Sequence, residues 1–311
     1  MPELRIASLL ASGTEIACAL GLDDRIVAIS HECDYPPHVL DRPRLSRPRF
    51  EPRGLDSGAI DRAVRSAMAA HGSVYAVDED ALARLAPTVI LTQAVCEVCA
   101  VPTPGVREIV RTQRLPAEVV SLDAHTLDDI FRTVLQVGVA CGVEDRALAL
   151  VERLQARVRR IEEAVAGRPR PRVLALEWLD PPFIPGHWVP EQIERAGGVC
   201  IAGRTGERSE QAGWDRLAGL DPDALVVMPC GYGLQASLAD AGRFATSLVS
   251  AAPRAIATGH AWAVDGSAFF NRSGPRAVEG IEILASLLHP EAMGTARPGT
   301  AARWQPDYVR E

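Results

Sequence analysis

The chain of 311 residues carries a formal net charge of −7, and its 33 basic residues are all arginine. The absence of lysine excludes a Schiff-base lysine and a Walker-type phosphate loop, and the acidic balance without a basic stripe argues against a nucleic-acid partner. No apolar run is long enough to cross a bilayer, so we expect no membrane insertion, and the length favours two lobes over one.

An α/β pattern starts almost at the first residue, which leaves no room for a secretory signal and predicts a cytoplasmic location. Strands alternating with helices favour a mostly parallel sheet that is covered on both faces. In the first part of the chain we expect strands at 5–10, 26–30, 89–92 and 118–122, and helices at 14–20, 60–70 and 103–111.

Helical spacing of apolar residues continues from Leu127 to Ala166, where Gly138 and Gly142 predict either two helices or one bent helix. The strand and helix alternation then resumes, with strands expected at 173–176, 225–228 and 261–264 and helices at 190–196, 234–250 and 274–288. The predicted organisation is an N-terminal α/β lobe at 1–124, a helical connector at 125–168, a C-terminal α/β lobe at 169–290 and a poorly packed tail at 291–311.

Ligands of open α/β sheets lie beyond the carboxyl ends of the strands, so the residues that follow each strand are the candidate site residues. They are Ser12, Thr14, His31, Glu32, Cys33, Tyr35, Gln93, Cys96, Cys99, Glu177, Trp178, His187, Trp188, Cys230, Tyr232, Asn271 and Arg272.

Several of these residues also have a structural interpretation. Ser12-Gly13-Thr14 is most simply a helix cap, although an amide-rich helix start also suits an anionic group. Cys96 and Cys99 have the Cys-x-x-Cys spacing of metal and dithiol sites, and a zinc site would need two more ligands. Cys18, Cys141 and Cys200 lie on apolar helical or near-helical faces and are expected in the core.

His187 and Trp188 follow a proline-rich loop, which suits a flat or metal-bearing ligand through axial coordination and stacking. The chain has no Gly-x-Ser-x-Gly elbow, no His-Glu-x-x-His motif and no phosphate loop, so the sequence does not positively indicate catalysis.

The opening segment, residues 5–16 followed by Ala19-Leu20-Gly21-Leu22, resembles the cobalamin and iron-siderophore substrate-binding proteins of ABC importers. The segments His31-Glu32-Cys33-Asp34-Tyr35-Pro36, Gly186-His187-Trp188 and Asn271-Arg272-x-Gly274-Pro275-Arg276 resemble a leaderless subgroup that is described as cobalamin-binding. The resemblance implies two three-layer α/β lobes joined by a long backbone helix, with a ligand cleft between the lobes.

The first functional hypothesis is a cytoplasmic ligand-binding protein that holds cobalamin, a related corrinoid or another metal chelate, with His187 or His31 as an axial ligand. An ABC permease partner is not expected without export. One alternative is a metal-ion or thiol-redox protein whose metal ligands are Cys33, Cys96, Cys99 and Cys230. A second alternative is a small-molecule enzyme in which His31, Glu32 or Glu177 acts as acid or base.

Overall fold

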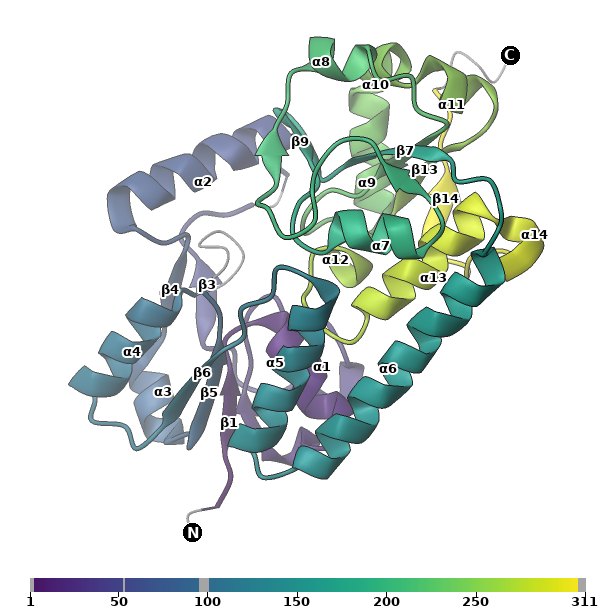
Figure 1. Ribbon diagram of the computed structural model, residues 1–311. Helices are drawn as coiled ribbons and strands as arrows, with labels where there is room; N and C mark the ends of the chain where they lie inside the picture. Colours follow the sequence, from purple (N-terminus) through teal and green to yellow (C-terminus); the bar gives the residue numbers. More distant parts are fainter. Residues whose placement is uncertain (1–2, 53, 95–100, 307–311) are drawn as a thin grey trace. The chain divides into compact units, whose positions relative to one another are not determined.

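The computed structural model describes residues 3–52, 54–94 and 101–306, which form two compact units (Figure 1). Unit 1 comprises Met1–Leu55, Arg62–Ala124 and Asp128–Arg153, and unit 2 comprises Asp56–Asp61, His125–Leu127 and Leu154–Glu311. The division falls inside the long helix α6 (Glu144–Val165). Two α/β units that share a long helix confirm the predicted fold class, whereas the ligand cleft between two lobes stays a prediction.

The sheet of unit 1 is parallel throughout and has the strand order β2-β1-β5-β6. A parallel sheet has both faces covered, so its strands are continuous apolar runs of the kind that the sequence shows. The strands are β1 (Ile6–Ser8), β2 (Ile26–Ala28), β5 (Val89–Thr92) and β6 (Glu118–Ser121).

Helices cover both faces of this sheet. Ala7 and Ile90 of the sheet share a hydrophobic cluster with Leu82 of α3 (Glu79–Leu85) and Val106 of α4 (Thr103–Thr112). On the opposite face lie α1 (Ala11–Ala19) and α5 (Leu127–Ala140), as Figure 1 shows. These three layers are the architecture that alternating strands and helices predict.

The remaining elements of unit 1 lie between β2 and β5 in the sequence or directly precede β2. The arginine-rich stretch 42–53, which is broken by prolines, contains a short strand that pairs antiparallel with one partner only, so proline disturbs no inner ladder. These elements are η1 (Asp23–Arg25), η2 (Pro37–Val39), β3 (Ser46–Pro48), β4 (Tyr75–Val77) and α2 (Ser57–His71), whose first residues belong to unit 2.

The main sheet of unit 2 has the order β10-β7-β12-β13-β14, and only β14 runs antiparallel to its neighbour. Alternate residues of β7 point to opposite faces, so Leu174 and Leu176 join the cluster formed with α8 to α11, while Val173 packs near Ile193 of α7. The strands are β7 (Arg172–Leu176), β10 (Val199–Cys200), β12 (Ala224–Val227), β13 (Ala261–Val264) and β14 (Ala301–Arg303).

Helices of unit 2 form two layers, and a small antiparallel sheet, β11-β9-β8, extends from the end of β7. One layer contains α8 (Trp214–Ala218), α9 (Leu234–Arg243), α10 (Ala245–Ala251) and α11 (Pro253–Ala257). The other contains α7 (Val189–Arg195) and α13 (Ala277–Leu288), and the short elements are β8 (Trp178–Leu179), β9 (Pro182–Ile184), β11 (Glu210–Gln211), α12 (Gly266–Phe269) and α14 (Pro290–Met293).

The predicted poorly packed tail is wrong for its middle part. β14 pairs with β13, and Trp304 is only 4% exposed within the core of unit 2. The flanking prolines and glycines favoured a loop. An edge strand can nevertheless be as short as the three residues of β14, so it requires no long apolar run in the sequence.

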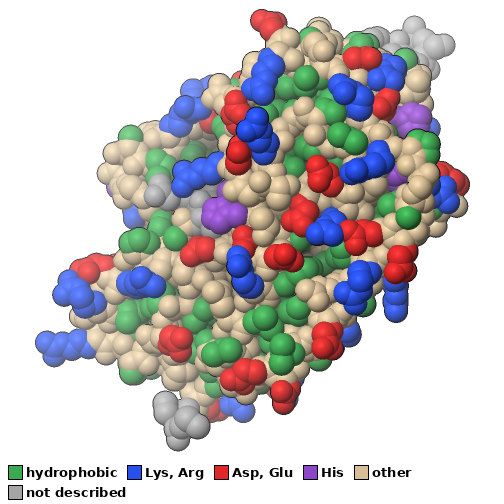
Figure 2. Space-filling view, viewed as in Figure 1, with side chains coloured by type: hydrophobic (Ala, Val, Ile, Leu, Met, Phe, Trp, Pro, Cys, Tyr) green, Lys and Arg blue, Asp and Glu red, His purple; other side chains and the backbone are tan. Residues whose placement is uncertain are grey.

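The helical connector consists of two helices, α5 and α6, which agrees with one of the two predicted forms. Gly142 lies between them with a φ of +68°, a conformation that favours glycine. No helix in the described residues combines the length and apolar character needed to span a membrane. On the face shown in Figure 2, acidic and basic side chains are interspersed.

Candidate functional site

The candidate residues of unit 1 differ widely in exposure. Ser12, Thr14 and Gln93 are only 4%, 0% and 9% exposed, whereas Tyr35 is 45% exposed. A ligand at this edge of the sheet would therefore meet Tyr35 directly, whereas the side chains of Ser12, Thr14 and Gln93 are buried.

The prediction that Ser12-Gly13-Thr14 caps a helix is wrong. Helix α1 begins at Ala11, and its N-cap residue Leu10 makes no side-chain capping bond. A Cβ atom on Gly13 would lie 2.9 Å from Ser8 Oγ and 3.1 Å from Leu91 Cβ. Glycine thus lets the first turn of α1 press against the sheet, and the Thr14 hydroxyl points inward to Cys33 Sγ at 3.1 Å.

His31 is held by neighbours from several segments. Its Nδ1 atom lies 2.8 Å from Ser46 Oγ, and its ring centroid lies 4.7 Å from that of Tyr75. Its Nε2 atom lies 3.0 Å from Glu32 Oε1, an ion-pair distance without the alignment of a hydrogen bond. This arrangement fixes the imidazole in one orientation at the strand end.

Arg44 is a site residue that the sequence reasoning missed. Its guanidinium donates hydrogen bonds to the carbonyl oxygens of Ser30, His31 and Cys33 at 3.0, 2.9 and 3.0 Å. It thereby fixes the loop that carries His31 and Cys33. The signal was present in the arginine-rich stretch, but the sequence does not show which arginine reaches the loop.

In unit 2 an aromatic pair lies at the ends of two adjacent strands. Trp178 follows β7 and Tyr232 follows β12, and their rings meet edge to face with centroids 5.3 Å apart. Trp178 Nε1 donates to Asp180 O at 3.0 Å, which fixes the indole. Burial raises the pKa of Tyr232 to about 12, with a further contribution from Asp240, so its hydroxyl keeps its proton at neutral pH.

Polar groups line the same edge of the unit 2 sheet. The Glu177 carboxylate accepts a hydrogen bond from Ser209 Oγ at 2.6 Å. Asn271 Oδ1 accepts from the backbone N–H of Gly231 at 3.3 Å, next to the exposed Cys230. Arg272 is 9% exposed and donates to Ser267 Oγ at 3.3 Å, so it supports the loop from inside.

His187 occupies a strained position within unit 2. Its φ is 51°, and its backbone is held by hydrogen bonds with Glu207 O at 2.6 Å and with the N–H of Gly206 at 2.9 Å. Burial lowers the pKa of the imidazole, and His125 and Arg208 lower it further, so the ring is neutral at pH 7.

The partner of His187 is His125, which the sequence reasoning also missed. The two Nδ1 atoms lie 3.3 Å apart and the ring centroids 5.4 Å apart. His125 comes four residues after β6, so the rule of inspecting strand ends could have found it. Trp188 is 8% exposed, and its ring centroid lies 5.9 Å from that of His187.

The predicted metal ligands lie in separate environments. Cys33 is buried in unit 1 beside Thr14, whereas Cys230 is exposed in unit 2. Cys96 and Cys99 lie outside the described residues. The metal set Cys33, Cys96, Cys99 and Cys230 therefore stays a prediction.

Comparison with known proteins gives relatives of one kind. The chain is 23% identical over 294 residues to the uncharacterized ABC transporter substrate-binding lipoprotein YvrC of Bacillus subtilis, covering 92% of this chain and 80% of the relative. A stretch of 45 residues, 14% of this chain and 16% of the relative, is 49% identical to the vitamin B12-binding protein of Vibrio cholerae.

Solved structures show the same fold. The periplasmic vitamin B12 binding protein BtuF of Vibrio cholerae has a TM-score of 0.66 at 20% identity, covering 92% of this chain and 97% of that one. A periplasmic heme binding protein from Pseudomonas aeruginosa has a TM-score of 0.71 at 20% identity, covering 97% and 99%. Residues 6–261 match the family described as periplasmic binding protein. Since this match spans most of the chain, it confirms the resemblance to importer substrate-binding proteins, and the chain belongs to the periplasmic binding protein family.

Proposed function

We propose that this protein binds a flat metal chelate, such as a corrinoid, a heme or an iron chelate, through residues at the strand ends. The observation that carries the proposal is the Trp178–Tyr232 pair, because two half-buried rings at adjacent strand ends offer apolar surface to a macrocycle. Family membership supports it, as do the vitamin B12 and heme named for similar proteins.

His187 is the residue that we propose as an axial ligand of the bound metal. Imidazole ligates metals in its neutral form, and burial keeps His187 neutral at pH 7. Its Nδ1 atom faces His125, so coordination would use Nε2. The strained backbone of His187 supports a functional role, since strain of this kind gathers at ligand sites.

The test is a titration of purified protein with hemin, aquocobalamin and a ferric siderophore, followed by visible absorption and calorimetry. We expect at least one of them to bind with a change in its visible spectrum. His187→Asn removes the imidazole but introduces a residue that tolerates the left-handed backbone at this position, so it should remove the spectral change. The matched control is His260→Asn, which alters an exposed histidine directly before β13, at the opposite edge of the sheet.

A second variant tests the aromatic pair. Trp178→Ala should weaken binding about 5- to 150-fold, at about 1–3 kcal/mol for a lost aromatic contact. Trp214→Ala, which removes a ring stacked on Phe244 in the helical layer, should leave affinity unchanged. The proposal is refuted if none of the three compounds produces binding heat or a change in its visible spectrum at high micromolar concentration.

The expectation that an ABC permease partner is unlikely is not supported, because the relative YvrC is named as an ABC transporter substrate-binding lipoprotein. The cytoplasmic location stays a prediction. Cell fractionation with an antibody to this chain would test the location, and co-purification with a membrane permease would test the partner.

A further inference from the structure

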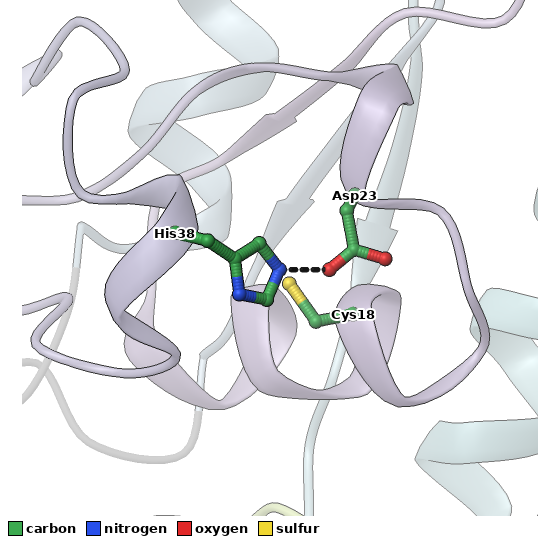
Figure 3. Close-up of side chains that lie close together, drawn as sticks. All are labelled: Cys18, Asp23 and His38. Carbon is green, nitrogen blue, oxygen red and sulfur yellow. Dashed lines mark hydrogen bonds and ion pairs between the residues drawn. The ribbon is translucent and has the colours of Figure 1, made fainter.

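A second group of ligating side chains lies in unit 1. Cys18, Asp23 and His38 each offer one donor atom, and these sulfur, oxygen and nitrogen atoms all lie within 4.8 Å of one another (Figure 3). His38 Nε2 lies 2.5 Å from Asp23 Oδ1. Among the described residues, no candidate from the strand ends belongs to this group.

The group lies at the edge of the unit 1 sheet where the strands begin, opposite the carboxyl ends that the candidate site residues follow. Asp23 opens η1, which leads directly into the first residue of β2, so it lies at the amino end of this parallel strand. The Cys18–Asp23–His38 group shares no residue with the proposed chelate site, whose residues Trp178, His187 and Tyr232 belong to unit 2.

Local structure fixes the three residues from three short elements. Cys18 lies near the end of α1, where the N–H of Gly21 donates to Cys18 O at 2.8 Å and Gly21 turns the chain with a φ of +70°. His38 lies in η2, which is anchored by the buried Val39. The side chains of His38 and Asp23 are 60% and 30% exposed, so an ion can reach them from solvent.

The donor set suits a divalent cation of borderline softness. Thiolate, imidazole and carboxylate are the ligand types that zinc takes, and three protein ligands leave a fourth position for water. With zinc bond lengths of about 2.0–2.3 Å, tetrahedral ligand atoms lie roughly 3.3–3.6 Å apart.

The observed spacing is close to that requirement. The widest pair must close by no more than about 1.5 Å, and the His38–Asp23 contact must open by about 1 Å. Rotation of the exposed His38 side chain can supply the second movement. Binding would release the thiol proton of Cys18 to solvent, since the thiolate is the ligand.

We propose that Cys18, Asp23 and His38 form a binding site for a divalent cation of the zinc class, with water in the fourth position. The sequence predicted Cys18 as a core residue, but it is half-buried and faces Asp23. His38 carried no sequence signal because its partners lie 15 and 20 residues away.

The test uses metal alone, so its outcome is separate from that of the chelate titrations. Chelator-treated protein is titrated with Co²⁺, whose thiolate charge-transfer band and visible bands report sulfur ligation and tetrahedral geometry, and Zn²⁺ binding is measured by displacement of Co²⁺. We expect one ion per chain with a cobalt–thiolate band. Cys18→Ser should abolish that band, and His38→Gln and Asp23→Asn should weaken binding at least tenfold.

Two matched controls isolate the site. Cys141→Ser removes another half-buried cysteine, directly after α5, and His71→Gln removes an exposed histidine at the end of α2, so both should bind Co²⁺ as the parent does. His38→Gln changes an exposed side chain and is expected to fold, which circular dichroism checks. The proposal is overturned if no cobalt–thiolate band forms at submillimolar metal, or if the band persists in Cys18→Ser.

Discussion

Neutralising Asp240 should stabilise unit 2 at neutral pH. This carboxylate of α9 is 1% exposed, with Ser57 Oγ at 3.3 Å and Arg243 Nη1 at 3.9 Å. Burial raises its pKa from 3.8 to about 6, and the nearby Asp180 and Asp56 add to the rise, while Ser57 and Arg243 oppose it. The folded unit therefore holds a charged group at pH 7.5 that would be more stable protonated.

The difference between the folded and unfolded pKa gives the magnitude. A rise from 3.8 to about 6 corresponds to at most about 3 kcal/mol of unfolding free energy. Because the folded pKa is the higher one, this stability is fully present below pH 3.8 and is lost as pH rises through 6. Asp240→Asn, which stays neutral, should exceed the parent by up to about 3 kcal/mol at pH 7.5 and match it near pH 4.

Guanidinium unfolding monitored by tryptophan fluorescence reports the stability of unit 2, which contains Asp240. All five tryptophans lie in unit 2, namely Trp178, Trp188, Trp214, Trp262 and Trp304. Asp41→Asn, a change at an exposed carboxylate of unit 1, serves as the control and should leave the unfolding free energy of unit 2 unchanged at every pH. A difference between Asp240→Asn and the parent that does not vary between pH 4 and 7.5 would refute the reasoning.

Two further predictions concern packing and titration in unit 2. Gly280→Ala should lower the unfolding free energy by about 1–3 kcal/mol, because its Cβ would lie 2.5 Å from both Gln192 Nε2 and Phe269 O. Gly242→Ala is the control and should leave the unfolding free energy unchanged or raise it, because its Cβ would meet no atom within 4 Å. Equal effects of the two substitutions in denaturant unfolding would contradict this prediction. The pKa of His187 is lower in the folded protein than in the unfolded chain, so the unfolded chain takes up a proton more readily than the folded one and the unfolding free energy should fall as pH drops below 6.5. His187→Asn should reduce that fall, whereas the control His260→Asn should leave it unchanged.

Much of the fold could be predicted from the sequence because parallel strands buried on both faces are recognisable as short apolar runs. The strands at 89–92 and 261–264 have the predicted bounds, and the connector forms two helices, one of the two predicted options. The expected helix at 234–250 is instead two helices, α9 and α10, separated at Phe244. Apolar periodicity continues across such a break, so the pattern alone does not reveal it.

The candidate site divides in the same way. Topology alone indicates that residues after parallel strands share one edge of the sheet, so the sequence predicts Trp178 and Tyr232 at the same edge, and in the structure their rings meet. Exposure could not be predicted, because the closeness of Gly13 to β1 and β5 decides that Ser12 and Thr14 turn inward.

The sequence by itself determined the α/β class, the repeated strand-end pattern and the absence of lysine chemistry, since these depend on local periodicity and composition. Only the tertiary structure decided which side chains meet. His125 meets His187 across 62 residues, and His38 meets Asp23 across 15. Contacts of this kind are set by how helices and loops pack on a sheet, and residue spacing along the chain carries no record of that packing.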